Sequence, residues 1–195
     1  MKKLMIAAVI VCAAIVTQAA TFNWKTGKSQ EIAMPGTEDT YVSSATAYIF
    51  AYSTTGKGTV VDPATFVTAF AAGTLDLSSA ALDFATMTDG VVPQTSPDFN
   101  YGAVGDSTKF FMALIAKDGA GNDMLYISPE STAVAGAEGK TNTAQIKGWE
   151  ASTAAAKDAA AGYAGAGWYT AVPEPTSGLL LLLGVAGLTL RRRRA

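Results

Sequence analysis

The 195-residue sequence contains no histidine and only one cysteine, Cys12. Without imidazole groups, Ser-His-Asp and Cys-His catalysis and the usual histidine-bound zinc, iron or copper sites are excluded. Cys12 lies in an N-terminal apolar run that we expect to be removed, so the mature protein would have no disulfide and no thiol nucleophile. The remaining enzymatic routes are paired carboxylates, a Ser-Lys arrangement, or a hard cation bound by oxygen atoms.

Positive charge is also scarce away from the ends of the chain. Apart from Lys2, Lys3 and four C-terminal arginines, the sequence has eight lysines against 16 acidic residues, a net charge of −8. This acidity argues against a nucleic-acid partner, which requires clustered cations. It also favours a soluble exported domain. We predict no cofactor.

The first 20 residues have the three parts of a secretory signal peptide. Two lysines precede an apolar stretch from Leu4 to Val16, and small residues follow it. We predict cleavage by signal peptidase after Ala19, with Ala20 the alternative. An uncleaved anchor or a buried core helix is the competing interpretation, but 13 apolar residues fall short of the about 20 needed to span a membrane.

The C-terminal residues 172–195 also form three successive blocks. Pro173, Glu174 and Pro175 make a stiff polar segment that cannot be helical, an apolar run predicted as a helix covers 178–190, and four arginines follow at 191–194. As a helix the apolar run is about 20 Å long, which is short for a bilayer. The arginines Arg191, Arg192, Arg193 and Arg194 are predicted to stay in the cytoplasm.

This end of the chain resembles the PEP-CTERM sorting domain, the bacterial tag recognised by exosortase. The resemblance covers about residues 172–195 and rests on Pro173, Glu174 and Pro175, the apolar run and the arginines. It implies that exosortase, a membrane cysteine protease and transpeptidase, cuts near Pro173 to Pro175. The inner membrane would then hold only the precursor, and the domain would pass to the cell surface, outer envelope or extracellular matrix. An ordinary single-pass anchor with a basic stop is the alternative.

Between the ends we predict a mainly β ectodomain over 20–150, a small β-sandwich or roll with one short helix, flanked by the N-terminal signal helix (1–19) and the C-terminal hydrophobic helix. Strands are predicted at 41–53, 82–88, 109–117, 124–128 and 143–149. A tight turn at 56–58 would pair a strand at 59–61 with 41–53, and the turn-rich residues 118–123 would close a second hairpin.

One helix stands out from the strand pattern. Asp62 can cap it, Pro63 suits its first position, residues 64–72 favour it and Gly73 can end it. Its apolar face predicts a lid across the sheet. The Ala/Gly-rich residues 151–167 predict a flexible or partly helical connector, and a possible last strand covers 168–172.

Two groups of residues could bind a ligand. Asp118, Asn122 and Asp123 could offer oxygen atoms to calcium, but their spacing fits no known calcium loop and hairpin-turn chemistry explains them better. Six aromatic residues could stack on the sugar rings of an extracellular polysaccharide, although in a β domain without disulfides such side chains are more often core residues. These are Trp24, Tyr101, Trp149, Tyr163, Trp168 and Tyr169.

No catalytic constellation emerges from the sequence. A glycosidase would need two carboxylates about 5 to 10 Å apart, and the sequence cannot choose a pair. Lys109 or Lys117 beside a serine could be a dyad, but lysines that flank an apolar strand normally mark where it meets water. We therefore predict a non-enzymatic structural or adhesive surface protein. A carbohydrate-binding module and a secreted carboxylate-based hydrolase are the alternatives.

Overall fold

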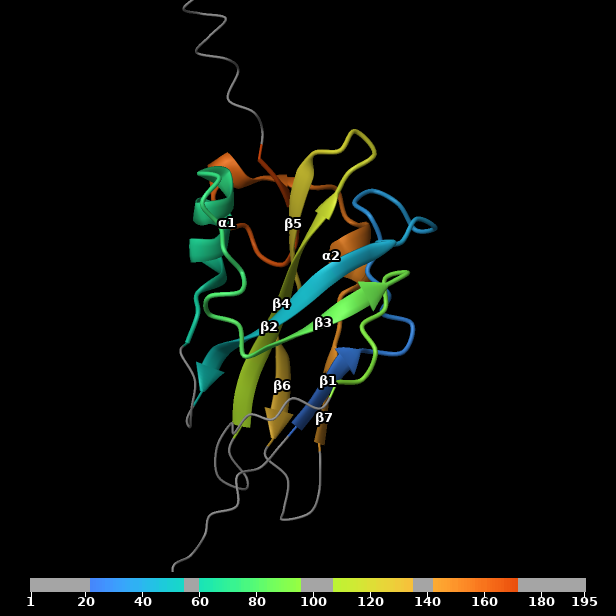
Figure 1. The fold of residues 1–195 in the computed structure, drawn as a ribbon, viewed down its shortest axis with the longest axis vertical. Coiled ribbons are helices and arrows are strands. Elements are labelled where there is room, and N and C mark those ends of the chain that lie inside the picture. The colour runs from blue at the N-terminus through green and yellow to red at the C-terminus, as the bar shows by residue number, and fades with distance from the viewer. Residues whose placement is uncertain (1–21, 55–59, 96–106, 135–141, 172–195) are drawn as a thin grey trace, which may run out of the picture.

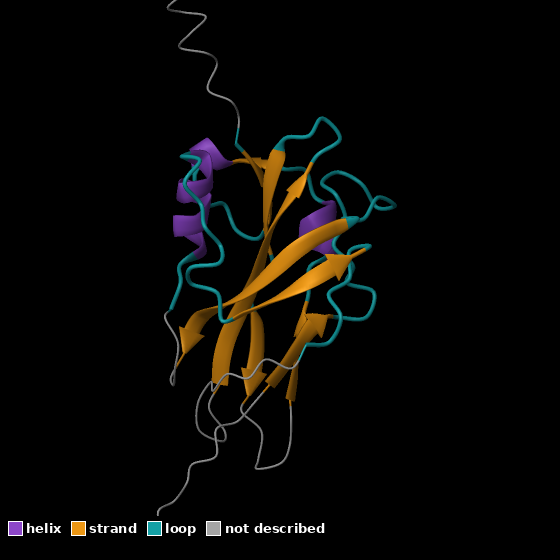
Figure 2. Ribbon diagram, in the orientation of Figure 1, coloured by secondary structure: helices purple, strands orange, loops and turns teal. Residues whose placement is uncertain are grey.

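The computed structural model describes residues 22–54, 60–95, 107–134 and 142–171. The predicted signal helix and the predicted C-terminal hydrophobic helix lie outside these residues. The described part is mainly β, as predicted, with nine strands, two α-helices and one 3-10 helix among the described residues. Figures 1 and 2 show a central twisted sheet with a helix on each side of it.

Seven strands form the central sheet. Six of them follow the order β3-β2-β4-β5-β9-β8, and β6 pairs with the N-terminal part of β4. All neighbours are antiparallel except β8 and β9. The strands are β2 (Ser44–Thr54), β3 (Asp83–Thr88), β4 (Ser107–Lys117), β5 (Asp123–Ile127), β6 (Ser131–Val134), β8 (Lys157–Asp158) and β9 (Gly167–Thr170).

A second sheet has two parallel strands, β1 (Phe22–Thr26) and β7 (Asn142–Ile146). It packs against one face of the central sheet together with α2 (Trp149–Thr153). The buried Trp24 joins the two sheets, because its indole Nε1 donates a hydrogen bond of 2.7 Å to Asp83 Oδ2 on the edge strand β3. This parallel pairing was not predicted, since its partners are about 120 residues apart in the chain.

The opposite face is covered by α1 (Pro63–Ala71), which forms as the sequence predicts. Asp62 Oδ1 accepts the N–H of Ala64 at 2.9 Å, and Gly73 follows the helix with a φ of +67°. Phe66, Val67 and Phe70 are buried against the sheet. The Phe66 ring packs edge-on against Phe50 of β2, with ring centroids 4.7 Å apart, so the predicted lid is confirmed.

The hairpin β4–β5 is confirmed, but the predicted hairpin between 41–53 and 59–61 is wrong. Residues 55–59 lie outside the described part, and Val60 forms only an isolated bridge with Ala51, in the parallel sense. A tight turn would have made the pairing antiparallel. The physical reason is that Asp62 and Pro63 start α1 at once, which leaves no length for a returning strand.

The segment predicted as a connector is part of the folded domain. Residues 151–167 include the end of α2, the short strand β8 and the 3-10 helix η1 (Ala159–Ala161). Ser152 is fully buried, and its Oγ accepts the backbone N–H of Ala33 at 3.1 Å. The predicted strand at 143–149 ends at Ile146 as β7, because Trp149 begins α2. The possible last strand predicted at 168–172 forms as β9 over Gly167–Thr170, and it lies between β5 and β8.

Candidate functional site

The last described strand ends just before the predicted sorting signal begins. Thr170 is the last residue of β9 and pairs with Met124 of β5, and the exposed Ala171 is the last described residue. The predicted sorting and stop residues follow it and lie outside the described part, as do Ala19 and Ala20. The last described strand pairing therefore lies three positions before Pro173.

A groove of about 450 Å³ opens beside Ala171. We call it the junction groove. Residues after α1 form one wall, and the turn between β4 and β5 forms the other. Its lining includes Gly73, Leu75, Gly121, Asn122, Asp123 and Ala171. Leu75 is half-buried and packs on the core beneath α1, so the groove has an apolar floor and a polar rim.

The turn that borders this groove contains the residues considered for calcium. Asp118 Oδ1 accepts the N–H groups of Ala120 and Asn122, both at 2.8 Å, and its Oδ2 accepts the Asn122 side-chain amide at 2.9 Å. These donors, chiefly the Asn122 side chain, lower the pKa of Asp118 below its usual 3.8. The carboxylate thus acts as the closing group of a hairpin turn, as the turn interpretation predicted.

The two lysines considered for a Ser-Lys dyad both form ion pairs. Lys109 Nζ lies 2.7 Å from Glu130, and Lys117 Nζ lies 2.8 Å from Asp123. The hydrogen bond and charge of Glu130 raise the pKa of Lys109, whereas a general base needs a lowered one. Neither contact involves a serine, so the geometry does not support a dyad at these positions.

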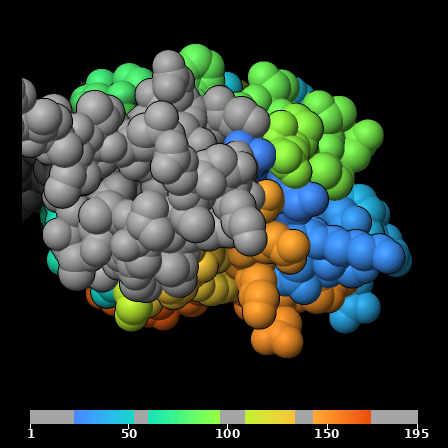
Figure 3. All heavy atoms as spheres, turned by 90° about the horizontal axis from the view of Figure 1, so that it is seen from below, coloured from blue at the N-terminus to red at the C-terminus, as the bar shows by residue number. Residues whose placement is uncertain are grey.

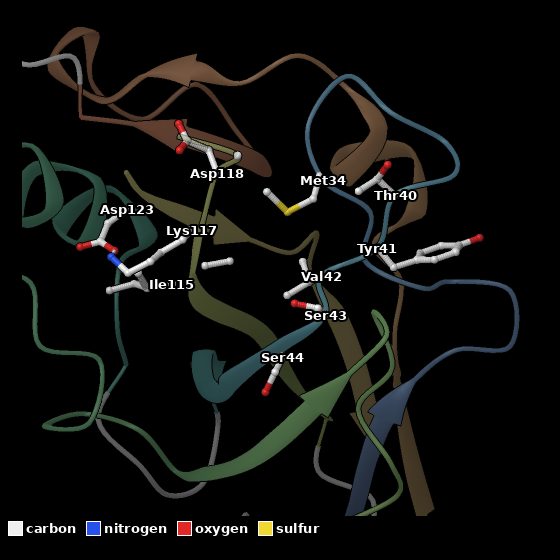
Figure 4. Close-up of a pocket in the computed structure, with 12 residues that line it drawn as sticks. Met34, Thr40, Tyr41, Val42, Ser43, Ser44, Ile115, Lys117, Asp118 and Asp123 are labelled. Carbon is white, nitrogen blue, oxygen red and sulfur yellow. Dashed lines mark hydrogen bonds and ion pairs between the residues drawn. The ribbon is translucent and has the colours of Figure 1, made fainter. Parts of the chain in front are cut away.

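A second groove, of about 680 Å³, lies between the 34–44 segment and the same hairpin. It is lined by the hydroxyl-bearing residues Thr40, Ser43 and Ser44 and by the apolar residues Met34 and Val42. Figure 4 shows Met34 facing the hairpin, whereas the ring of Tyr41 points outward, away from it. Sequence analysis missed this groove, because residues about 75 positions apart come together only through the pairing of β2 with β4.

The structure separates the six candidate aromatic residues. Trp24, Trp168 and Tyr169 are fully buried, which confirms the core interpretation for these three, while Tyr101 lies outside the described residues. Trp149 and Tyr163 remain at the surface, Trp149 half-buried and Tyr163 39% exposed.

The two surface rings have different neighbours. The Trp149 ring lies 6.1 Å from that of Tyr41, at a tilt of 42°. Tyr163 instead stacks on Tyr169, in the core cluster on the α1 side. The pKa of Tyr163 is raised to about 12, mainly because the side chain is partly buried. The described candidates therefore do not form one flat aromatic platform.

Acidic groups are dispersed over the described residues. Within this part of the chain no three histidine, cysteine, aspartate or glutamate side chains gather closely enough to hold a metal ion. The pKa values of Asp76 and Asp118 are both lowered, because neighbouring hydrogen-bond donors stabilise the carboxylates. A carboxylic general acid needs the opposite shift, so neither residue suits that role.

Comparison with known proteins identifies the tail. Residues 171–194 match the family model of the PEP-CTERM protein-sorting motif, which confirms the resemblance seen in the sequence. The match begins at the last described residue, one position after β9. The motif implies an exported protein whose membrane-anchored precursor is sorted by exosortase. Neither the curated proteins nor the solved structures contain a match to this chain.

None of the helices in the described part of the chain has the length and hydrophobicity required to cross a membrane.

Proposed function

We propose that the mature protein is a non-enzymatic structural or adhesive component of the cell surface or extracellular matrix. One observation carries this proposal: the sorting motif starts one residue after Thr170, the last strand residue that the structure describes. A cut near Pro173 to Pro175 would therefore remove the tail and leave every described strand in place. The product of sorting is the whole β domain, ready to act outside the membrane.

The character of the domain supports a passive role. Its stability rests on two apolar clusters, one on each face of the central sheet. The aspartates whose pKa values are lowered accept hydrogen bonds within turns. The lysines considered for catalysis form ion pairs with acidic residues. A net charge of −8 keeps such a domain soluble once it is released or attached at the surface.

Fractionation of the native host tests this role. We expect the processed protein to co-purify with extracellular polymer and surface material, and cells lacking the protein to attach to surfaces less well or form a weaker matrix. Complementation with the wild-type protein should restore the phenotype. Complementation with a form in which Pro173, Glu174 and Pro175 are alanines should not. Free diffusion of the processed protein into the medium, with normal matrix and attachment, would contradict the proposal.

Binding of an extracellular polysaccharide is the second candidate, and one observation favours it. Tyr41, which is 39% exposed, borders the larger groove next to hydroxyl groups and packs against Trp149. Partly exposed aromatic rings and hydroxyl groups are the side chains that contact sugar rings and their hydroxyls. Glycan-array binding that is lost in Tyr41→Ala, but retained in Tyr163→Ala on the other face, would establish this activity. Equal binding by all three proteins would contradict it.

A further inference from the structure

The domain surface nearest to the sorting motif is the junction groove. Ala171 lines this groove, together with Gly73 and Leu75 on one side and Gly121 to Asp123 on the other. The hairpin side is anchored by the hydrogen bonds of Asp118, and the α1 side by the packing of Leu75 on the core. The tail thus leaves the domain from a formed surface with two fixed walls.

The chain between this surface and the motif is very short. Pairing with Met124 holds Thr170 in the sheet, and Pro173 is only three positions further along the chain. Fully extended, three residues span at most about 11 Å, which is roughly the width of one helix. An enzyme that binds the backbone near Pro173 must therefore lie against the end of the domain from which the tail leaves.

We propose that the junction groove is the surface of this protein that contacts the exosortase while the sorting motif is cut. The inference rests on exosortase sorting and adds where on the domain the enzyme docks. Lys117 and Asp123 neutralise each other at the rim, so the contact depends on shape and on the apolar floor at Leu75 rather than on net charge. Such contact would let the enzyme recognise the domain end as well as the motif.

The opposite end of the molecule is excluded by its distance from the tail. Figure 1 shows β1 and β7 at the end opposite to the C-terminal end of the described chain (red), and Figure 3, seen from the β1 and β7 end, shows the first described residues (blue) beside residues after position 142 (orange). Thr143 of β7 is exposed there. It therefore provides a matched control position on the same domain.

Site-specific photocrosslinking in the native host tests the proposal. A photoreactive residue is placed in the full-length protein at Thr74 or Ala120, exposed neighbours of the two groove walls, and at Thr143 as the control. We expect crosslinks to exosortase from Thr74 and Ala120 and none from Thr143. A ten-residue Gly/Ser spacer inserted after Ala171, which adds about 17 Å of flexible reach, should weaken the crosslinks while tail cleavage continues.

Two outcomes would overturn the proposal. If the tail is cleaved but Thr143 crosslinks as strongly as Thr74 and Ala120, or none of the three crosslinks, the groove is not the docking surface. Absence of any tail cleavage in the wild type is a different result, because it would contradict exosortase sorting itself.

Discussion

At the scale of single residues, Lys157 holds together the loop that leads into the last strand. Its Nζ donates to the carbonyl oxygens of Ala164, Gly165 and Ala166 at 3.0, 3.0 and 2.5 Å, and lies 5.4 Å from the centre of the Tyr169 ring. Burial lowers the pKa of Lys157, while three carbonyl dipoles and an aromatic face surround the cation. One side chain thereby closes the approach to β9.

We predict that Lys157→Met destabilises the domain by about 1–3 kcal/mol, because the half-buried carbonyl oxygens lose their shared donor. Urea unfolding of the purified domain measures the change. Lys147→Met is the matched control, since Lys147 is exposed. It should change the free energy of unfolding by no more than about 0.5 kcal/mol. Equal effects of the two substitutions would contradict the role of Lys157.

A titratable residue gives a pH prediction. The pKa of Asp118 is lowered in the folded state, so its contribution to stability is present above the unfolded value of 3.8 and is lost as pH falls through the folded value. Asp118→Asn should therefore be less stable than the wild type at pH 7, and the gap should narrow with acidification below about pH 5. Thermal unfolding across pH 2–7 checks this, and a gap that widens in acid would refute it.

At the scale of elements, the structures predicted correctly are those specified by neighbouring residues. Helix α1 has a capping aspartate, a proline at its first position and a glycine after its end, and each of these signals is local. The β4–β5 hairpin is likewise marked by turn-forming residues between two apolar runs. Signals from neighbouring residues are therefore sufficient to predict these elements.

The elements that were missed depend on distant partners or lack local signals. β1 is stabilised by β7, far along the chain, and α2 follows Gly148, which has no side chain to cap the helix. The isolated bridge at Val60 depends on an edge of β2 that β3 leaves open. The larger groove could not be predicted for the same reason, because its two walls meet only in the folded sheet.

The cap of α1 can be tested directly. Asp62→Ala removes the acceptor for the Ala64 N–H and should cost about 1 kcal/mol in the free energy of unfolding. Asp39→Ala is a control at an exposed position that changes the net charge equally. Chemical denaturation distinguishes the two variants, and an unchanged midpoint for Asp62→Ala would show that the cap contributes nothing.

At the scale of the whole molecule, the position of β9 determines where processing can occur. β9 is an inner strand, and both Trp168 and Tyr169 are fully buried. Trp168 Nε1 also donates to the carbonyl of Ala33 at 2.9 Å, which ties the C-terminal strand to the N-terminal part of the domain. A cut before Thr170 would therefore remove part of the core.

Truncation should reveal this boundary. A chain that ends at Ala171 should fold with the stability of the longer protein, whereas one that ends at Ala166 should fail to fold. Losing two buried aromatic side chains costs about 3–5 kcal/mol each, which approaches the whole stability of an ordinary domain. Circular dichroism and urea unfolding of the two chains measure the difference, and a stable fold in the shorter chain would contradict the assigned role of β9.

The central claim is that the folded domain is released whole from its sorting tail, and intact-mass analysis of the protein from its native host tests it most directly. We predict a surface form that ends within Pro173 to Pro175 and is lost when these three residues are replaced by alanines. A wild-type protein that keeps Arg191 to Arg194 and remains in the membrane would show that the tail is a permanent anchor, and would contradict the account.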